Sequence, residues 1–195
     1  MTAGRKVVTI NKDWSTPRKY VEAIREFFGG QVQLDPCSSR DSIVTAEVEY
    51  KLPEKDGLVE SWDFATIYVN PPYGADRERK TTIWDWLQRC ATAHSKHGSE
   101  VLALVPVAVN TRHWKEFVFG QASSVCFLAD TRLRFIINGA ESNKGAPMAC
   151  AMVYWGRNGE RFYQVFSRFG AVVSLSNLIE KRWRSPDLNH RLTTF

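Results

Sequence analysis

Residues 70–73 read Asn-Pro-Pro-Tyr and follow an apolar run, residues 67–69, that is typical of the end of a buried strand. Neither proline has an N–H for a strand ladder, and each proline holds the residue before it in extended geometry. Asn70 and Pro71 are therefore expected to be stiff and extended where the strand ends. The Asn70 carboxamide and the Pro71 carbonyl then offer two acceptors beside the flat ring of Tyr73, an arrangement that suits an amino group on a planar ring.

A second polar stretch follows another short strand pattern. The sequence QVQLD is typical of a strand that ends at Asp35, and Pro36 comes next. In open α/β sheets, ligands bind beyond the carboxyl ends of the strands. Because both stretches put polar, proline-bearing residues at such an end, we expect Asp35 and Asn70 to share one site.

Helices and strands that can position this site alternate along the chain. Ser15-Thr16-Pro17 is typical of a helix start, with a hydroxyl cap, and that helix is expected to end at Gly29-Gly30. Further helices are predicted over residues 81–96 and 111–120. The alternation predicts an α/β layered fold with a mainly parallel sheet. The expected strands are residues 31–35, 65–70, 100–107, 123–129 and 148–156, with an edge strand within 162–175.

Length, charge and cysteine use bound the class of protein. The chain has 195 residues, enough for one domain with a sizeable core, and its net charge of +5 favours a polyanionic partner. The four cysteines form no CxxC pair, which indicates reduced thiols, and Cys126 and Cys150 lie in apolar runs expected in the core. No segment has the pattern of a signal peptide or the length of a membrane span. We therefore expect a reducing, cytoplasm-like compartment.

Several segments resemble amino-group methyltransferases that use S-adenosylmethionine. The family form of the motif at residues 70–73 is Asp, Asn or Ser, then Pro-Pro, then an aromatic residue. DWSTPRKYV at residues 13–21 resembles the Thr-Pro segment of these enzymes, and LDPCSS at residues 34–39 resembles their Asp-Pro-x-x-Gly-Ser cofactor loop.

The rest of the match is closer to one family. It consists of DGLVESW at 56–62 before NPPYG, LALVPV at 102–107 with Thr111, Arg112 and Trp114, and ADTRLRFI at 129–136 before APMACAMVYWG at 146–156. Together, residues 13–156 resemble the phage-type Dam family of DNA adenine methyltransferases. The resemblance implies a Rossmann-like class I methyltransferase fold in a compact domain at 13–178, with an N-terminal arm at 1–12 and a basic tail at 179–195.

The same resemblance implies an activity and a catalytic motif. A methyl group would pass from S-adenosylmethionine to the N6 amino group of an adenine flipped out of double-stranded DNA, with no metal. Asn70 and the carbonyl of Pro71 would accept hydrogen bonds from that amino group, and Pro72 completes the motif. Tyr73 would stack on the adenine, with Phe135 on its other side. The enzyme would act as a monomer or weak homodimer in the cytoplasm of a bacterial or phage-infected cell.

The resemblance also implies a binding site for the cofactor. Asp35 would hold its ammonium group, Ser38 and Ser39 its carboxylate, and Asp56 the amino group of its adenine. The full implied set is Trp14, Thr16, Pro17, Asp35, Pro36, Ser38, Ser39 and Asp56. DNA contacts are expected from basic residues near the motif. They are Arg77, Arg79, Lys80, Arg112 and Lys144, with Lys115, Arg132 and Arg134 as further candidates.

The chain departs from the family pattern in two places. Cys37-Ser38-Ser39 stands where many relatives carry glycines, so side chains are expected to do more of the cofactor binding. The separation from Asp35 to Asn70 is short, so the strand that usually supplies an acid for the cofactor ribose is expected to be missing or reduced. Glu47 and Glu49 are possible substitutes. Nothing in the length allows a large target-recognition domain, so sequence readout must come from loops.

Other functions stay open at this point. The motif chemistry also serves cytosine N4, RNA adenine and protein glutamine, although the positive charge and the wider match favour DNA adenine. A non-catalytic nucleic-acid-binding module of the same fold is supported by the altered Cys37-Ser38-Ser39 loop and opposed by intact Asp35 and Asp56. A kinase-like protein is disfavoured because the chain has no GxxxxGK[ST] loop. Restriction-modification and marking of viral DNA are both open as biological roles.

Overall fold

The computed structural model describes residues 14–177, apart from residues 131, 138, 144 and 147. The arm predicted at 1–12, the tail predicted at 179–195 and Lys144 lie outside the described residues. The main strands are β1 (Leu34–Asp35), β2 (Val48–Glu49), β3 (Thr66–Val69), β4 (Glu100–Pro106), β5 (Ser124–Leu128), β8 (Cys150–Trp155) and β9 (Gly170–Ser174). They form one seven-stranded sheet in the order β2-β1-β3-β4-β8-β5-β9, and β6 (Ile136–Ile137) pairs with β7 (Ala140–Glu141) in a separate hairpin.

The sheet is mixed. β1 pairs in parallel with β2 and β3, and β3 pairs in parallel with β4. β8 is antiparallel to both β4 and β5, and β9 is antiparallel to β5. The predicted parallel pairing therefore holds only from β2 to β4. The connection from β5 to β8 contains a hairpin and no described helix. Because parallel pairing needs a long crossover connection, β8 pairs antiparallel to β5.

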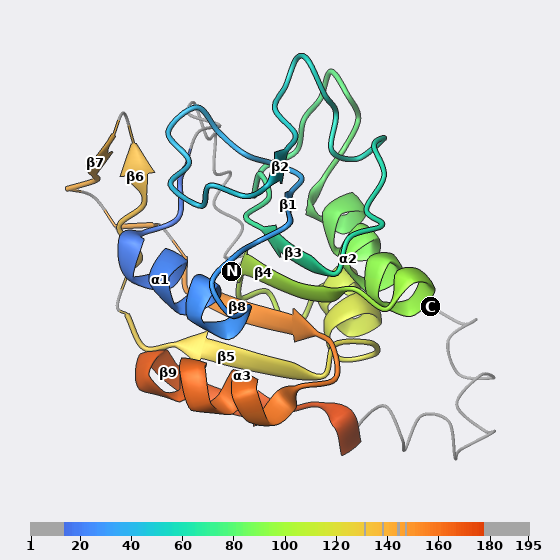
Figure 1. Ribbon diagram of the computed structural model, residues 1–195, viewed down its shortest axis with the longest axis vertical. Coiled ribbons are helices and arrows are strands. Elements are labelled where there is room, and N and C mark those ends of the chain that lie inside the picture. The colour runs from blue at the N-terminus through green and yellow to red at the C-terminus, as the bar shows by residue number, and fades with distance from the viewer. Residues whose placement is uncertain (1–13, 131, 138, 144, 147, 178–195) are drawn as a thin grey trace, which may run out of the picture.

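Helices cover both faces of the sheet (Figure 1), so it has two cores. α1 (Arg18–Phe27) and α3 (Gly159–Phe166) lie on one face, and α2 (Ile83–His97) lies on the other with a π-helical turn at Trp114–Val118. Successive residues of β4 point to opposite cores and are all buried from 101 to 105. This explains its near-continuous apolar run, since a strand covered on both faces has no polar side.

Two helix predictions need correction. The hydroxyl cap predicted for α1 is wrong, because Pro17 is the N-cap residue and no side chain caps the helix. The backbone of Ser15 pairs with Ile136, at 3.0 and 2.9 Å, and holds the segment extended before the helix. The stretch predicted to hold only an edge strand also contains α3, whose buried residues are Phe162, Val165 and Phe166, before β9 begins. Their i, i+3, i+4 spacing is the helical signal.

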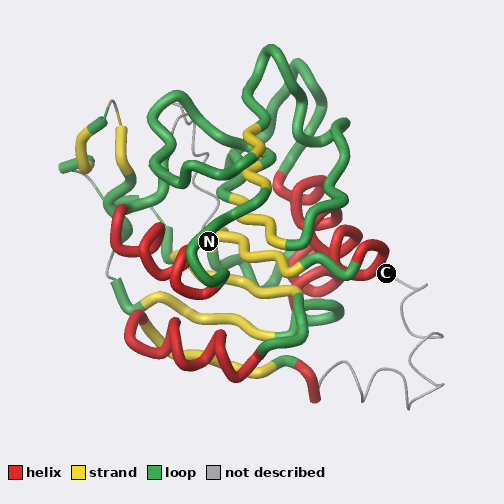
Figure 2. The backbone as a smooth tube through the Cα atoms, viewed as in Figure 1, coloured by secondary structure: helices red, strands yellow, loops and turns green. Residues whose placement is uncertain are grey.

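The long loops lie together at one end of the sheet. Figure 2 shows the connection from β1 to β3 and the connection from β3 to α2 side by side above the strands. Within this part, a Cβ added to Gly57 would lie 1.7 Å from the carbonyl oxygen of Pro36, so only glycine fits there. These loops and the carboxyl ends of β1 and β3 frame the candidate site. Cys126 and Cys150 are buried in the core, as predicted.

Candidate active site

A pocket opens where β1 and β3 end, and the Asp35 and Asn70 segments meet in it. The first residues before α1 form another part of its wall. Its empty space is about 350 Å³ when the part open to solvent is counted with it. The lining residues are Trp14, Ser15, Thr16, Asp35, Cys37, Ser39, Ser42, Val44, Tyr68, Asn70 and Pro72.

Asp35 places a nearly inaccessible carboxyl group in this pocket. Asp35 is the last residue of β1 and is 3% exposed. Its Oδ1 accepts a hydrogen bond from the Cys37 N–H at 3.1 Å. Burial raises the pKa of Asp35 to about 7, and the Cys37 hydrogen bond only partly opposes this effect. The nearby charge of Glu49 raises the pKa further. A cation that entered the pocket would favour the charged form of Asp35.

Hydroxyl groups surround the same end of the pocket. Thr16 Oγ1 and Tyr68 Oη lie 2.6 Å apart in a buried hydrogen bond, and Ser15 Oγ and Ser39 Oγ are also 2.6 Å apart. Ser38 precedes Ser39 and is not among the residues that line the pocket, but its Oγ is buried and has no hydrogen-bond partner within the described part of the chain. A buried hydroxyl without a partner is costly unless a ligand or water completes it. The segment is therefore suited to a polar ligand.

Asn70 follows β3 and is held in one orientation. Its Nδ2 donates to the backbone carbonyl of Trp14 at 2.7 Å, so the amide is assigned with Oδ1 on the other side. The hydroxyl of Tyr73 lies 3.3 Å from this Oδ1 and 3.2 Å from the carbonyl oxygen of Leu104. Because the hydroxyl has one proton, it can donate to only one of these acceptors at a time. Asn70 Oδ1 thus keeps capacity for another donor.

Three aromatic rings pack together beside Asn70. Trp14 stacks on Phe135 with ring centroids 5.1 Å apart and an interplanar angle of 21°. Tyr73 meets Phe135 edge-on at 5.9 Å and 73°. A base stacked between two rings needs about 7 Å and near-parallel planes, since each contact takes about 3.5 Å. The structure brings the two predicted stacking residues together, but a base enters between them only if the rings separate.

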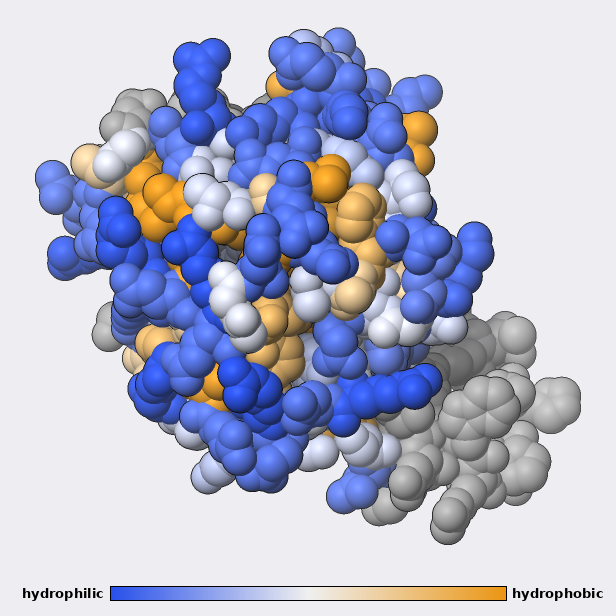
Figure 3. Space-filling view, in the orientation of Figure 1, coloured by the Kyte–Doolittle hydropathy of each residue, from blue (hydrophilic) through white to orange (hydrophobic). Residues whose placement is uncertain are grey.

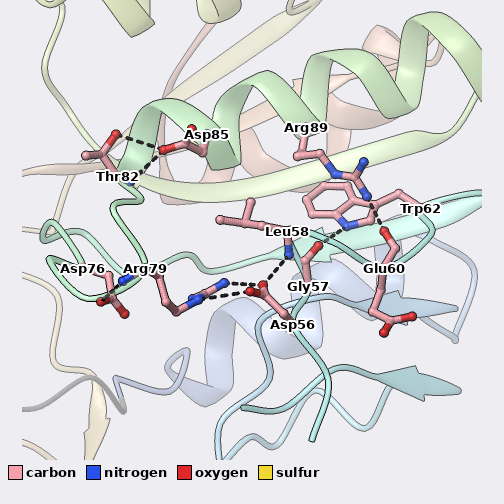
Figure 4. A network of polar contacts seen from close by, with 10 residues as sticks. All are labelled: Asp56, Gly57, Leu58, Glu60, Trp62, Asp76, Arg79, Thr82, Asp85 and Arg89. Carbon is pink, nitrogen blue, oxygen red and sulfur yellow. Dashed lines mark hydrogen bonds and ion pairs between the residues drawn. The ribbon is translucent and has the colours of Figure 1, made fainter. Parts of the chain in front are cut away.

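Asp56 is not among the pocket residues, and its carboxylate is engaged. Both of its oxygens bind the guanidinium of Arg79, and Oδ1 also accepts the Leu58 N–H at 2.9 Å (Figure 4). Asp56 nevertheless stays next to the pocket segment through the contact of Gly57 with Pro36. Its position in the sequence predicted that Arg79 contacts DNA, whereas its side chain points toward Asp56.

The other predicted DNA contacts have varied surroundings. Arg77 and Lys80 are exposed in the loop after the motif. Arg112 is exposed, with Nε 2.7 Å from Glu116 and its guanidinium over the ring of Trp84. The candidates Lys115, Arg132 and Arg134 are also exposed. On the face shown in Figure 3, the described surface is mostly hydrophilic and apolar side chains appear only in separate areas.

The strand expected to carry a ribose-binding acid is reduced to two residues. β2 ends at Glu49, which lies opposite Asp35 in the parallel ladder. Glu49 Oε2 is 2.7 Å from the ammonium of Lys51. Glu47 precedes the strand and is exposed. Of the two acids, Glu49 therefore lies closer to the pocket.

Sequence reasoning missed several pocket residues. Tyr68 reads as a core residue of a strand, and nothing in the sequence indicates that its hydroxyl reaches Thr16. Ser42 and Val44 come from the irregular segment after Asp35, whose path depends on tertiary contacts. Ser15 could have been found, because it belongs to the Ser-Thr-Pro segment that the resemblance assigns to the cofactor site.

A protein-family model matches most of the chain. The model described as DNA N-6-adenine-methyltransferase (Dam) matches residues 5–183, which include every residue of the pocket. Comparison with curated proteins gives no match. Within residues 14–177, where described, no helix is long and apolar enough to cross a membrane, and no group of three or more His, Cys, Asp or Glu could hold a metal ion.

Proposed function

The chain belongs to the DNA N-6-adenine-methyltransferase (Dam) family, and from that premise we propose that it methylates N6 of an adenine flipped out of double-stranded DNA, using S-adenosylmethionine. The observation that carries this proposal is the meeting of Asn70 and Asp35 in one pocket. The half of the sheet from β2 to β4 is parallel, and two of its strands, β1 and β3, end at that pocket. This arrangement supports a Rossmann-like methyltransferase fold.

The residues present suit the cofactor. The buried carboxyl of Asp35 would bind its ammonium group, and the unpartnered hydroxyl of Ser38, with Ser39, would bind its carboxylate. Glu49, opposite Asp35 in the ladder, would bind its ribose, and Asp56 would accept from its adenine amino group. S-adenosylmethionine supplies a methyl group on a positively charged sulfur.

The motif residues would activate the target amino group by position and electrostatics. The lone pair of an adenine amino group is delocalised into the ring, so the group is a poor nucleophile. Asn70 Oδ1 and the Pro71 carbonyl would draw its hydrogens out of the ring plane and return electron density to the nitrogen. The hydrogen bond from Asn70 Nδ2 to Trp14 fixes the acceptor in advance, as electrostatic catalysis requires. No covalent intermediate with the protein is needed.

Methyl transfer from tritiated S-adenosylmethionine tests the function directly. We expect label in DNA, recovered after hydrolysis as N6-methyladenine, and none in RNA or in a protein extract offered in parallel. Label recovered only as N4-methylcytosine, or only in protein, would contradict the choice of substrate. Calorimetric titration with S-adenosylhomocysteine separates these cases from a binding module that has lost its cofactor, because such a module would show no cofactor binding.

Tyr73→Phe is expected to change kcat/KM for DNA by less than about threefold, because stacking on a base requires the ring and not the hydroxyl. The lost O–H donates weakly, at 3.3 Å from Asn70 Oδ1 and 3.2 Å from Leu104. Tyr73→Ala should lower kcat/KM by about tenfold or more, since base–aromatic stacking contributes about 1–3 kcal/mol. A large loss in Tyr73→Phe would show that the hydroxyl acts on Asn70.

A further inference from the structure

Arg79 differs from the basic residues beside it in the loop after the motif. Arg77 and Lys80 are exposed, whereas the side chain of Arg79 is 21% exposed. Its guanidinium binds both carboxylate oxygens of Asp56, with Nε 3.1 Å from Oδ2 and Nη2 on Oδ1 (Figure 4). A two-point arginine–carboxylate pair fixes direction as well as distance. Arg79 is therefore committed to Asp56 and does not project into solvent.

The loop that carries Arg79 is a closed turn. Asp76 and Thr81 exchange backbone hydrogen bonds of 2.8 and 3.1 Å, and Asp76 Oδ1 accepts the Arg79 N–H at 3.2 Å. Thr82 follows at once and caps α2 in a capping box with Asp85. The backbone of Arg79 is thus held near the start of α2. The side chain of Arg79 extends from there to Asp56.

Asp56 is fixed from its own side as well. Its Oδ1 accepts the Leu58 N–H, and the next residue, Gly57, packs directly on Pro36. The carbonyl of Gly57 accepts a 2.7 Å hydrogen bond from the buried Trp62 indole. The Arg79–Asp56 pair therefore connects the β2–β3 segment, which packs on Pro36 and is proposed to bind cofactor, with the loop after β3, proposed to meet DNA.

Asp56 keeps one acceptor site. A carboxylate has about four lone-pair sites. Oδ1 takes the Leu58 N–H and one Arg79 nitrogen, and Oδ2 takes the other Arg79 nitrogen. Within the described residues Oδ2 has no other donor, so its second lone-pair site suits one more N–H donor and Arg79 need not leave for a ligand to bind.

We propose that Arg79 is a positioning residue: it holds Asp56 for the adenine amino group of the cofactor, and through the same pair cofactor binding steadies the loop that carries Arg77 and Lys80. This inference rests on the proposed function. It replaces the role of phosphate contact that sequence position suggested for Arg79. Because such coupling is reciprocal, DNA binding should also tighten cofactor binding.

A double-mutant cycle in cofactor affinity tests the positioning role. S-adenosylhomocysteine is titrated by calorimetry, without DNA, into the wild type, Arg79→Gln, Asp56→Asn and the double variant. We expect each single change to weaken binding about tenfold. The double variant should bind no more weakly than either single variant, because both changes disrupt the same Arg79–Asp56 contact. Arg157→Gln, which removes an exposed arginine elsewhere, should bind within about twofold of the wild type. Unchanged affinity in Arg79→Gln, or losses that multiply to about a hundredfold, would overturn the proposal.

The coupling is measured as the ratio of DNA affinities with and without saturating S-adenosylhomocysteine. The wild type should bind DNA more tightly with the ligand, and Arg79→Gln should lose that difference while its salt dependence without ligand stays unchanged. A salt slope reduced by about one in Arg79→Gln would assign it to a phosphate and reject the inference. A wild type that binds no S-adenosylhomocysteine would reject the proposed function and this inference together, whereas a binding wild type with an unaffected variant rejects only the inference.

Discussion

Asn70→Ala is expected to lower kcat for methyl transfer to DNA by about 10²–10³-fold, the usual cost of removing one preorganised polar group from a reacting centre. The change removes the Oδ1 acceptor for the target amino group. It also removes the Nδ2 donor that binds Trp14 at 2.7 Å. Affinity for S-adenosylhomocysteine should change by less than about threefold, since Asp35, Ser38 and Ser39, which the proposal assigns to the cofactor, are unchanged.

Asn70→Asp separates the two functions of the amide. The carboxylate keeps an acceptor for the amino group, but it cannot donate to the Trp14 carbonyl, and the two oxygens would repel each other. We expect activity between that of the wild type and Asn70→Ala. Single-turnover rates, measured beside calorimetric binding of S-adenosylhomocysteine, give both quantities. Wild-type activity in Asn70→Ala would mean that Asn70 is not the acceptor, whereas lost cofactor binding would mean that the residue supports the pocket.

The shared location of Asp35 and Asn70 could be predicted because it depends on strand ends alone. Asp35 is the last residue of β1 and Asn70 directly follows β3, and parallel neighbouring strands bring such ends together whatever the loops do. The residues that complete the pocket could not be found in this way. Tyr68 contributes a hydroxyl from the interior of β3, and Ser42 arrives from a segment without periodic pattern. Their positions depend on contacts between distant parts of the chain.

The direction of a charged side chain is also hidden from the sequence. Arg77, Arg79 and Lys80 are equivalent as letters in a basic loop, yet one of the three turns inward because Asp56 lies opposite it. The cap of α1 illustrates the same point. Ser15 and Thr16 have the residue types of a cap, but the Ser15 hydroxyl is bonded to Ser39 and the Thr16 hydroxyl to Tyr68.

The departure of the sheet from mainly parallel pairing has a comparable cause. β8 reads as a fully buried apolar strand, and a strand buried on both faces has the same composition in either direction. Its direction is set by the connection before it. That connection contains the β6–β7 hairpin, and the sequence does not show that β8 inserts between β4 and β5.

Asp35→Asn is expected to stabilise the cofactor-free fold at pH 8 while it weakens cofactor binding. Burial raises the pKa of Asp35 from 3.8 to about 7, so between these values the folded chain holds a proton that the unfolded chain has released. Stability therefore falls as pH rises from about 4 to 7, and the cost of the charged form above pH 7 is of order 4 kcal/mol. Asparagine carries no such cost, and its oxygen can keep the Cys37 hydrogen bond.

Urea unfolding at pH 5 and pH 8, in reductant, measures this effect. The difference in unfolding free energy between Asp35→Asn and the wild type should grow in favour of the variant as pH rises. An advantage that is independent of pH, or a variant less stable at pH 8, would show that Asp35 is not held largely protonated below neutrality.

Cofactor binding should respond to pH with the opposite sign. An ammonium ligand binds the charged form of Asp35, whose fraction rises from about a tenth at pH 6 to about half at pH 7 for a pKa of about 7. Wild-type affinity for S-adenosylhomocysteine should therefore increase about fivefold over that interval, with proton release detected by calorimetry in buffers of different ionisation enthalpy. Asp35→Asn should bind about 30-fold more weakly or worse, with no such pH dependence. A pH-independent wild type would place the ammonium elsewhere, because a buried carboxyl cannot take a cation without losing its proton.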